Sequence, residues 1–497
     1  MPAAWPVHPF VHEVFTWVWL GELGGRLGRR LTLADVPSDA WDDVARPGVD
    51  AVWLMGVWTR SPAGAAIARA DPAMMTEFRA ALPELTDDDV VGSAYCIRDY
   101  HVDPWLGGDE GLAARAALAD RGVRLVLDFV PNHVAPDHPW VTEHPEYFIQ
   151  GTSADLEADP RGFVAIGGHV FACGRDPYFP AWTDVVQLDA SRGAVRRAAA
   201  DLVSSIAERC DGVRCDMAML VLDDVFTRTW GPRATGGPSP DDGRGYWPTV
   251  TGAVRARHPG FVFWAEAYWD TEPRLVAQGF DACYDKRLYD RLVHREPARS
   301  VLAHLGADPA DQAHAVRFAE NHDVPRLASV LDPAPALAAA TAALTLPGVA
   351  LLHEGQAEGR RVRVPVQLAR RPREPVDADL RAWYDRLLEA TGDGLRRGEW
   401  ALARIEGWPD NRSCEHLVAW IWTTADHVEL VVVNLSDTPA DGRVLLDRVP
   451  SGRVAIADRF TGAVDERDGD DLAADGLYVG LDARQVHLLR WSTSGAG

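Results

Sequence analysis

The chain has 497 residues and a net charge of −23, with 47% hydrophobic and 25% charged residues. This composition excludes a mainly disordered or fibrous chain. The acidic balance repels phosphate backbones and anionic membrane surfaces, so we expect neither a nucleic acid nor a membrane as partner. No basic region followed by an apolar run and no uncharged stretch of about 20 apolar residues occurs, which favours a cytoplasmic protein. The sequence gives no indication of the oligomeric state.

Short apolar runs that end in polar residues recur along the first 395 residues, with helical patterns between them. Each run is typical of a buried strand in a parallel sheet. We predict such strands within residues 10–20, 49–57, 123–133, 212–216, 261–266, 280–285, 316–323 and 349–354, and helices at 110–121, 194–209 and 332–343. Eight strands that alternate with helices favour a (β/α)8 TIM barrel over an open doubly wound sheet.

Three stretches depart from this rhythm. One is rich in Pro, Gly, His and Asp and too long for an ordinary βα loop, so we predict a subdomain inserted at the C-terminal rim after the third strand. A second, residues 231–246, is predicted as another rim loop. After about residue 400, alternating strands with turn signals predict an all-β sandwich domain. The expected domains are barrel 1–133, inserted subdomain 134–185, barrel 186–395 and C-terminal β-sandwich 396–497.

The six cysteines are scattered along the chain. None forms a CxxC pair or a metal-ligand spacing with histidine. We therefore expect buried free thiols rather than a disulfide framework or a zinc site.

Four of the predicted strands end in an acidic residue, namely Asp128, Asp216, Glu266 and Asp323. Functional residues of such barrels lie where the strands end, so these acids are expected at one rim. Carboxylates gathered at one rim repel each other and cost desolvation energy unless they bind or react with something. Two chemistries suit them: an oxygen-ligated metal, or glycoside hydrolysis with one acid as nucleophile and another as acid/base.

The neutral and cationic residues beside these acids favour the second chemistry. His133, Arg214, Asn321 and His322 suit hydrogen bonds to sugar hydroxyls, and a neighbouring cation holds a carboxylate ionised. A magnesium site would favour fewer cations. A barrel enzyme with a carboxylate-bound metal stays open as an alternative.

The segments that carry these residues resemble the four sequence regions of the α-amylase superfamily, glycoside hydrolase family 13. They occur in the order typical of that family and read Asp128-Phe-Val-Pro-Asn-His133, Gly212-Val-Arg-Cys-Asp216, Trp264-Ala-Glu-Ala and Phe318-Ala-Glu-Asn-His-Asp323. The resemblance extends over about residues 10–495. Residues 137–148 also resemble the corresponding stretch of maltosyltransferase-like members.

The resemblance implies a role for each of these residues in a retaining mechanism. Asp216 would be the nucleophile, Glu266 the acid/base and Asp323 the carboxylate that braces the distorted sugar. The residues expected to bind substrate are Tyr95, Asp128, His133, Arg214, Asn321 and His322, with Tyr95 stacked beneath the sugar ring and Arg214 holding Asp216 ionised. Trp182, Trp247 and Trp269 lie in rim segments and are candidates for outer subsites.

The sequence departs from the calcium-binding amylases that it resembles. These place a Lys and a His three and four residues beyond the nucleophile, where this chain has Met219 and Leu220. Asn132 matches the remaining calcium ligand of the first region. We therefore expect no cofactor and no metal, with Asn132 as the candidate ligand if calcium binds.

The expected function is cleavage of α-glucosidic bonds in an oligosaccharide or an α-glucan, by hydrolysis or by transfer of the glycosyl group to another sugar. Hydrolysis is favoured because water needs no dedicated acceptor groups, while the similarity to maltosyltransferases keeps transfer as the alternative. A non-catalytic carbohydrate-binding relative is the alternative from another class, and the presence of all three catalytic acids argues against it.

Overall fold

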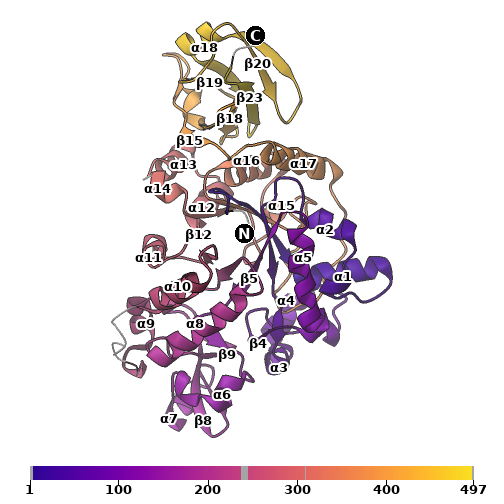
Figure 1. Ribbon diagram of the computed structural model, residues 1–497, viewed down its shortest axis with the longest axis vertical. Coiled ribbons are helices and arrows are strands. Elements are labelled where there is room, and N and C mark those ends of the chain that lie inside the picture. Colours follow the sequence, from indigo (N-terminus) through magenta and orange to yellow (C-terminus); the bar gives the residue numbers. More distant parts are fainter. Residues whose placement is uncertain (1–3, 235, 237–244, 308, 495–497) are drawn as a thin grey trace.

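The computed structural model describes residues 4–234, 236, 245–307 and 309–494. A barrel lies at the centre of the molecule, with the inserted segment at one end of its long axis and the C-terminal strands at the other (Figure 1). The predicted rim loop at 231–246 falls largely outside the described residues.

Eight parallel strands close into a barrel in the order β1-β14-β13-β12-β11-β10-β5-β2, which confirms the predicted (β/α)8 fold. These strands are β1 (Phe10–Phe15), β2 (Ala51–Met55), β5 (Arg124–Phe129), β10 (Gly212–Cys215), β11 (Val262–Ala265), β12 (Ala282–Tyr284), β13 (Ala315–Phe318) and β14 (Val349–His353). Such strands are covered on both faces, which explains why β2 reads Ala-Val-Trp-Leu-Met with every residue buried.

Helices alternate with these strands and cover the outside of the barrel (Figure 1). In the barrel region they are α1 (Thr16–Leu27), α2 (Ser38–Val44), α3 (Pro62–Ala70), α4 (Pro72–Ala81), α5 (Ala113–Ala119), α8 (Gly193–Ala207), α9 (Asp223–Trp230), α10 (Tyr246–Arg257), α11 (Glu272–Ala277), α12 (Lys286–Val293), α13 (Ala298–Leu305), α14 (Pro309–Gln312), α15 (Leu327–Val330), α16 (Pro333–Thr345) and α17 (Ala378–Gly392). A short ladder of β3 (Trp58–Arg60) and β4 (Ile97–Val102) projects from the rim.

The prediction of one strand over residues 10–20 is wrong in its second half. β1 ends at Phe15, and α1 begins at Thr16. Every residue of the run is buried, and a short buried run does not distinguish a strand from a helix by its periodicity. Gly28 ends the helix in the left-handed conformation, with φ +66°.

The segment that follows β5 folds around a sheet of its own. Its strands β6 (His133–Val134), β7 (Phe163–Ile166), β8 (His169–Gly174) and β9 (Trp182–Gln187) pair in the order β6-β9-β8-β7, and it carries the helices α6 (Pro139–Glu143) and α7 (Ser153–Ala158). Phe148, Phe171 and Val186 belong to a small apolar cluster inside it. Since β6 directly follows the barrel strand β5, this sheet is anchored at the carboxyl end of the barrel.

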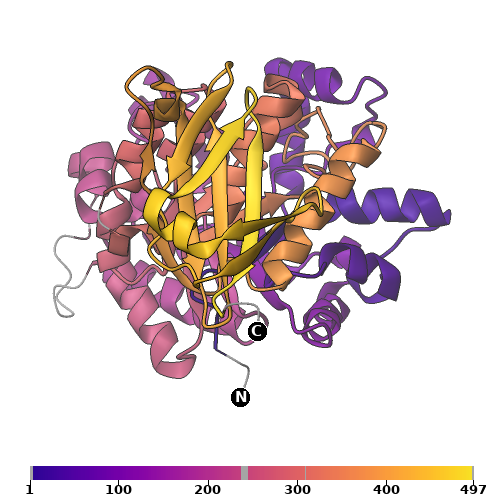
Figure 2. The same ribbon diagram turned by 90° about the horizontal axis from the view of Figure 1, so that it is seen from above.

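The C-terminal region forms two antiparallel sheets with a separate apolar core, which confirms the predicted C-terminal β domain. One sheet has the order β15-β17-β18-β23-β20-β21, and the other β16-β19-β22. The strands are β15 (Glu399–Leu402), β16 (Ile405–Glu406), β17 (Leu417–Thr423), β18 (His427–Asn434), β19 (Ala440–Val444), β20 (Arg453–Asp458), β21 (Val464–Asp468), β22 (Leu477–Leu481) and β23 (Val486–Ser492). A short helix, α18 (Gly469–Asp475), lies between β21 and β22 in the sequence. Figure 2 shows these sheets stacked over the barrel.

The six cysteines are free thiols, five of them buried and Cys414 half-buried. Among the described residues, we find no helix with the length and apolar character that a membrane span requires.

Candidate active site

Arg214 lies at the centre of the carboxylate cluster. Its Nη1 donates a hydrogen bond of 2.7 Å to Oδ1 of Asp216, and its Nη2 donates one of 2.7 Å to Oε2 of Glu266. The same Nη2 lies 3.7 Å from Oδ2 of Asp323. Alternate residues along a strand point to the same side, which brings Arg214 and Asp216 together at the end of β10. One buried guanidinium therefore contacts all three acids.

Asp216 and Glu266 are buried, and burial raises the pKa of both carboxyls. Arg214 acts in the opposite direction on each of them. The sequence predicts this effect of Arg214 for Asp216, but burial prevails. The charge of Asp216 adds to the increase in the pKa of Glu266. Two carboxyls on one guanidinium titrate as a coupled pair, and such a pair holds a proton more readily than separate exposed acids.

Glu266 receives hydrogen bonds on both oxygens. The hydroxyl of Tyr268 donates to Oε1 at 2.8 Å, and the backbone N–H of Met217 donates to Oε2 at 2.8 Å. Met217 directly follows Asp216 and adopts a left-handed backbone with φ +42°. A methionine in this conformation is strained, and such strain is a feature of functional sites. The strained turn thus fixes Glu266 relative to Asp216.

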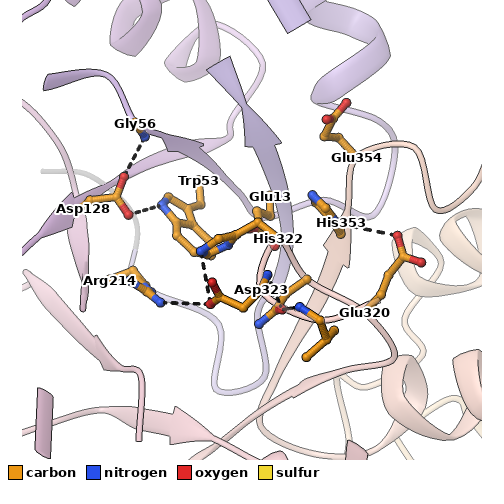
Figure 3. Close-up of polar contacts among 12 residues, drawn as sticks. Glu13, Trp53, Gly56, Asp128, Arg214, Glu320, His322, Asp323, His353 and Glu354 are labelled. Atoms are coloured by element: carbon orange, nitrogen blue, oxygen red, sulfur yellow. Dashed lines mark hydrogen bonds and ion pairs between the residues drawn. The ribbon is translucent and has the colours of Figure 1, made fainter. Parts of the chain in front are cut away.

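Asp128 is fully buried and is held by groups from the neighbouring strand and turn. The indole of Trp53 donates to Oδ1 at 3.1 Å, and the backbone N–H of Gly56 donates to Oδ2 at 2.8 Å (Figure 3). Gly56 has φ +75°, and a Cβ there would lie 3.0 Å from Cβ of Ala94, so glycine suits the position. Burial raises the pKa of Asp128 to about 6. These contacts hold the carboxyl of Asp128 in a fixed position near the end of β5.

Asp323 is more exposed than the other acids, with 38% of its side chain accessible. Arg214 and His322 approach it from two sides (Figure 3), and Nε2 of His322 lies 3.2 Å from its Oδ2. Burial opposes a charge on His322, but Asp323 and Glu13 outweigh it and raise the pKa of His322 to about 9. A cationic imidazole therefore stands beside Asp323.

Tyr95 and Asn321 complete this part of the site in different ways. The hydroxyl of Tyr95 lies 2.8 Å from Nε2 of His322, and its ring faces the guanidinium of Arg214 at 5.1 Å. Oδ1 of Asn321 accepts from the backbone N–H groups of Asp323 and Val324, at 3.0 and 3.2 Å. The side-chain oxygen of Asn321 thus shapes the loop that carries Asp323.

His133 is the first residue of β6 in the inserted segment and is buried. Its ring packs edge-on against Trp182, with ring centroids 5.4 Å apart. Burial lowers the pKa of His133 to about 4, so this imidazole is neutral at neutral pH. The two histidines of the site thus carry different charges.

The three tryptophan candidates for outer subsites lie in different environments. Trp247 is fully buried, and its indole N–H donates to the backbone oxygen of Ala218. The prediction of an outer subsite at Trp247 is wrong, because this residue of α10 packs into the core. Trp182 is half-buried beside His133. Trp269 is 36% exposed and packs edge-on against Tyr178 of the inserted segment, at 4.9 Å.

The surroundings of Asn132, the candidate calcium ligand, do not fit a cation. The amides of Asn132 and Gln187 hydrogen-bond each other in both directions, at 2.9 and 3.1 Å. Met219 and Leu220 are buried apolar side chains. Over the described ranges, no group of three His, Cys, Asp or Glu side chains has a geometry that could hold a metal ion.

Sequence reasoning missed several residues that hold the site together. Tyr284 accepts a hydrogen bond of 3.2 Å from Nε of Arg214, Trp53 and Tyr268 hold Asp128 and Glu266, and Glu13 contacts His322. One signal was present in the sequence: Glu13 is an acid in the middle of the apolar strand β1. The other three are aromatic residues, whose polar contacts the sequence pattern does not reveal.

Comparison with known proteins yields α-amylases and maltosyltransferases. The α-amylase MalA of Haloarcula japonica is 25% identical over 480 residues, which cover 94% of this chain and 60% of that protein. An α-1,4-glucan:maltose-1-phosphate maltosyltransferase of Cereibacter sphaeroides is 29% identical over 183 residues, 35% of this chain and 21% of that protein. The chain thus spans less than two thirds of either relative. No protein-family model matches it.

Among solved structures, the maltogenic α-amylase AmyB of Thermotoga neapolitana has a TM-score of 0.67 and 18% sequence identity. The alignment covers 98% of this chain and 99% of that structure. This similarity concerns the fold, from the barrel through the C-terminal domain.

Proposed function

Starting from the confirmed resemblance of the chain to the α-amylase superfamily, with its maltosyltransferase-like similarity, we propose that it is a retaining enzyme that cleaves α-glucosidic bonds of oligosaccharides or α-glucan. The observation that carries the proposal is the bridge from Arg214 to both Asp216 and Glu266. It places two coupled carboxyls at the end of adjacent barrel strands, as a double-displacement reaction requires.

Asp216 is the proposed nucleophile. Arg214 engages its Oδ1, so we assign Oδ2 to the attack on the anomeric carbon. The new bond forms as the bond to the leaving sugar breaks, which gives a β-linked glycosyl-enzyme intermediate. Nucleophile and acid/base carboxyls of retaining enzymes are about 5–5.5 Å apart, and we expect this separation in the substrate complex.

Glu266 is the proposed acid/base. It delivers its proton to the glycosidic oxygen in the first step and, as a carboxylate, removes a proton from water or a sugar hydroxyl in the second. Its raised pKa suits the first task. Oε1, the oxygen that Tyr268 contacts, is the proposed site of the proton, because Oε2 already accepts from Arg214 and Met217.

The remaining residues of the site bind and distort the sugar in this proposal. Asp323, His322 and His133 hydrogen-bond its hydroxyls, Tyr95 packs against its ring, and Asp128 supports the floor of the pocket. Hydrolysis is the proposed default reaction. Transfer to a second sugar is the alternative, and the exposed pair of Tyr178 and Trp269 favours it because sugar rings pack on aromatic faces.

The experiment that tests these roles uses α-glucosyl fluoride with added azide. Fluoride leaves with little protonation, so Glu266→Ala retains the first step, and azide then traps the β-linked intermediate as the α-azide. Asp216→Ala forms no intermediate, and azide that enters the vacated space gives the β-azide. Glu466→Ala, which removes an exposed acid of β21, serves as the control and is expected to behave as the wild type.

The outcomes separate the candidate functions. The same azide anomer from both variants, or turnover of maltooligosaccharides near the wild-type rate by either, would contradict the assignment. Product analysis on maltooligosaccharides, trehalose and sucrose, with and without phosphate, distinguishes hydrolysis from transfer. Binding of oligosaccharides without any turnover by the wild-type protein would point to the non-catalytic alternative.

A further inference from the structure

We propose that Glu13 is a positioning residue for the reaction, which orients the imidazole of His322 and keeps both of its ring nitrogens protonated. The carboxylate lies on β1, the strand farthest in sequence from His322 within the barrel, and none of the assigned catalytic or substrate-binding roles includes it. The proposal rests on the proposed function for its kinetic consequences, while its structural core can be tested without turnover.

Glu13 is completely buried in the barrel interior. The register of the barrel places it level with Trp53 of β2 and His353 of β14. Its Oε1 lies 2.5 Å from Nδ1 of His322, which corresponds to a short hydrogen bond between charged groups. A buried carboxylate is costly unless it is paired, so the contact with His322 explains why an acid stands in this apolar strand.

His322 is held by contacts around its ring. Trp53 packs edge-on at 5.5 Å, and Tyr95 stacks at 5.5 Å with an interplanar angle of 28°. Its Nε2 points to the hydroxyl of Tyr95 and to Asp323. Because an ionised Glu13 only accepts hydrogen bonds, Nδ1 must carry a proton, and a ring flip would place carbon atoms against Glu13 and Asp323.

The second ring proton follows from the charges that face His322. Glu13 on β1 and Asp323 beside it favour the cation, while burial and Arg214 on β10 oppose it, and the balance raises the pKa of His322 to about 9. Asp128 on β5 is a further acid in electrostatic contact with the ring. The cationic imidazole therefore offers an N–H at Nε2 toward Asp323 and toward a sugar hydroxyl.

The other histidine near Glu13 does not compete for it. Nδ1 of His353 accepts a hydrogen bond of 2.9 Å from Arg326, and burial and Arg326 lower the pKa of His353 to about 3. His353 is thus neutral, although it lies level with Glu13 on the adjacent strand. Burial favours the neutral form of Glu13, but the charge of His322 and the hydrogen bond from it favour the carboxylate, and the pKa of Glu13 is lowered; Tyr284 and Asp323 also face this carboxyl. Oε2 of Glu13 has no hydrogen-bond partner, so the charge is balanced through His322.

The test compares Glu13→Gln with the wild type by NMR of ¹⁵N-labelled histidine, and the His322→Gln spectrum assigns the signals. In the wild type, both ring nitrogens of His322 are expected to stay protonated up to about pH 9. Glu13→Gln is expected to lose the second proton at least one pH unit lower. Glu429→Gln, which replaces a buried carboxylate of the C-terminal domain, is the control and should leave the signal of His322 unchanged.

Kinetics supply a second readout. Glu13→Gln is expected to lower kcat/KM for maltotriose on the order of 10–100-fold, by analogy with carboxylates that orient metal-binding histidines. The alkaline limb of its pH profile should move to lower pH. Glu13→Asp, which keeps the charge, should keep the pH profile of the wild type and recover part of the lost kcat/KM. The double variant with His322→Gln should be no slower than His322→Gln alone, because Glu13 acts through that ring.

Three results would overturn the proposal. One is a titration of His322 that is the same in folded Glu13→Gln and in the wild type. A second is a lower melting temperature with an unchanged pH profile, which would indicate a purely structural role. A third is additive losses in the double variant.

If Glu13→Gln fails to fold, Glu13→Asp takes its place in the NMR comparison. An unchanged titration of His322 is expected there, and a pKa of His322 near 6.5 would contradict the proposal. An inactive wild type would refute the proposed function and leave the NMR test intact.

Discussion

The hydroxyl of Tyr268 donates a hydrogen bond of 2.8 Å to Oε1 of Glu266, on the opposite side of the carboxyl from Arg214. This contact favours the charged form of Glu266 and lowers its pKa. Tyr268 therefore limits how far burial can raise the pKa of Glu266. It thereby influences how readily Glu266 releases its proton.

Tyr268→Phe is expected to move the alkaline limb of kcat/KM for maltotriose to higher pH. Without the hydroxyl, Glu266 holds its proton more firmly, so the protonated enzyme persists to higher pH, and each transfer of the proton becomes slower, by roughly tenfold. The pH profile measures both effects. With α-glucosyl fluoride, which needs little protonation, the limb should stay in place. A shift to lower pH with maltotriose would contradict the proposed role of Glu266.

Trp269→Ala is expected to impair the use of longer substrates. Trp269 lies three residues after Glu266 and packs against Tyr178. Tyr178 and its neighbour Phe179 are 59% and 68% exposed. Loss of an aromatic contact of about 1 kcal/mol corresponds to a decrease of about fivefold in kcat/KM for maltotriose. Hydrolysis of α-glucosyl fluoride, which has no leaving sugar, should be unaffected.

The ratio of transfer to hydrolysis products gives an independent measure of the same surface. It should fall in Trp269→Ala, because an acceptor sugar loses its contact while water does not. Tyr478→Ala, which removes an exposed aromatic residue of the C-terminal domain, is the matched control. Equal losses on fluoride and maltotriose would show that Trp269 supports the catalytic centre instead.

Glu429→Gln is expected to stabilise the protein at alkaline pH. Glu429 lies on β18, both of its oxygens are buried without hydrogen-bond partners, and burial raises its pKa to about 7. A raised pKa means that the folded state binds the proton more tightly, so this stability is present below about pH 4.5 and is lost as the pH rises through 7. The difference corresponds to about 3 kcal/mol at most.

Melting temperatures at pH 5 and pH 8 check this expectation. Wild type and Glu429→Gln should melt at similar temperatures at pH 5, and the variant should melt higher at pH 8. Glu466→Gln, at an exposed position of the same domain, should show no such pH dependence. Arg459 and Arg490 favour the charged form of Glu429. A variant that is less stable than the wild type at both pH values would indicate that the attraction between these arginines and Glu429 stabilises the fold.

A chelator is expected to leave activity and melting temperature unchanged. The side-chain oxygen of Asn132 accepts a hydrogen bond from the amide of Gln187, and Leu220 is a buried apolar side chain that offers no ligand atom. Dialysis against EDTA, followed by measurement of turnover and thermal unfolding, checks this. A large decrease in either that added calcium reverses would show that other oxygen ligands have replaced the missing ones.

Much of the fold could be predicted because buried parallel strands leave a local signal. The acids Asp128, Asp216, Glu266 and Asp323 could be singled out since each ends such a run, and the ends of barrel strands lie at one rim. The boundary between β1 and α1 could not, because residues 10–20 are buried throughout and apolar side chains predominate in both elements.

The contact partners of individual side chains leave no comparable signal in the sequence. Asn321 stands next to two site residues in sequence, yet its side-chain oxygen binds the backbone of its own loop. Trp247 falls in a rim segment, yet α10 turns it into the core. Only the folded structure shows that Trp53 hydrogen-bonds Asp128 and that Tyr268 hydrogen-bonds Glu266.

The pairing of β1 with β14 has a consequence for synthesis of the chain. Residues Phe10 to Glu13 pair with Ala350 to His353, so the barrel interior around Glu13 cannot close until β14 has been made. At about 5–20 residues per second, the interval between these strands takes roughly 20–70 s. During that time β1 lacks its second neighbour, and its apolar residues stay available to chaperones or to other chains. β1 is thus the first barrel strand to leave the ribosome and among the last to complete its pairing.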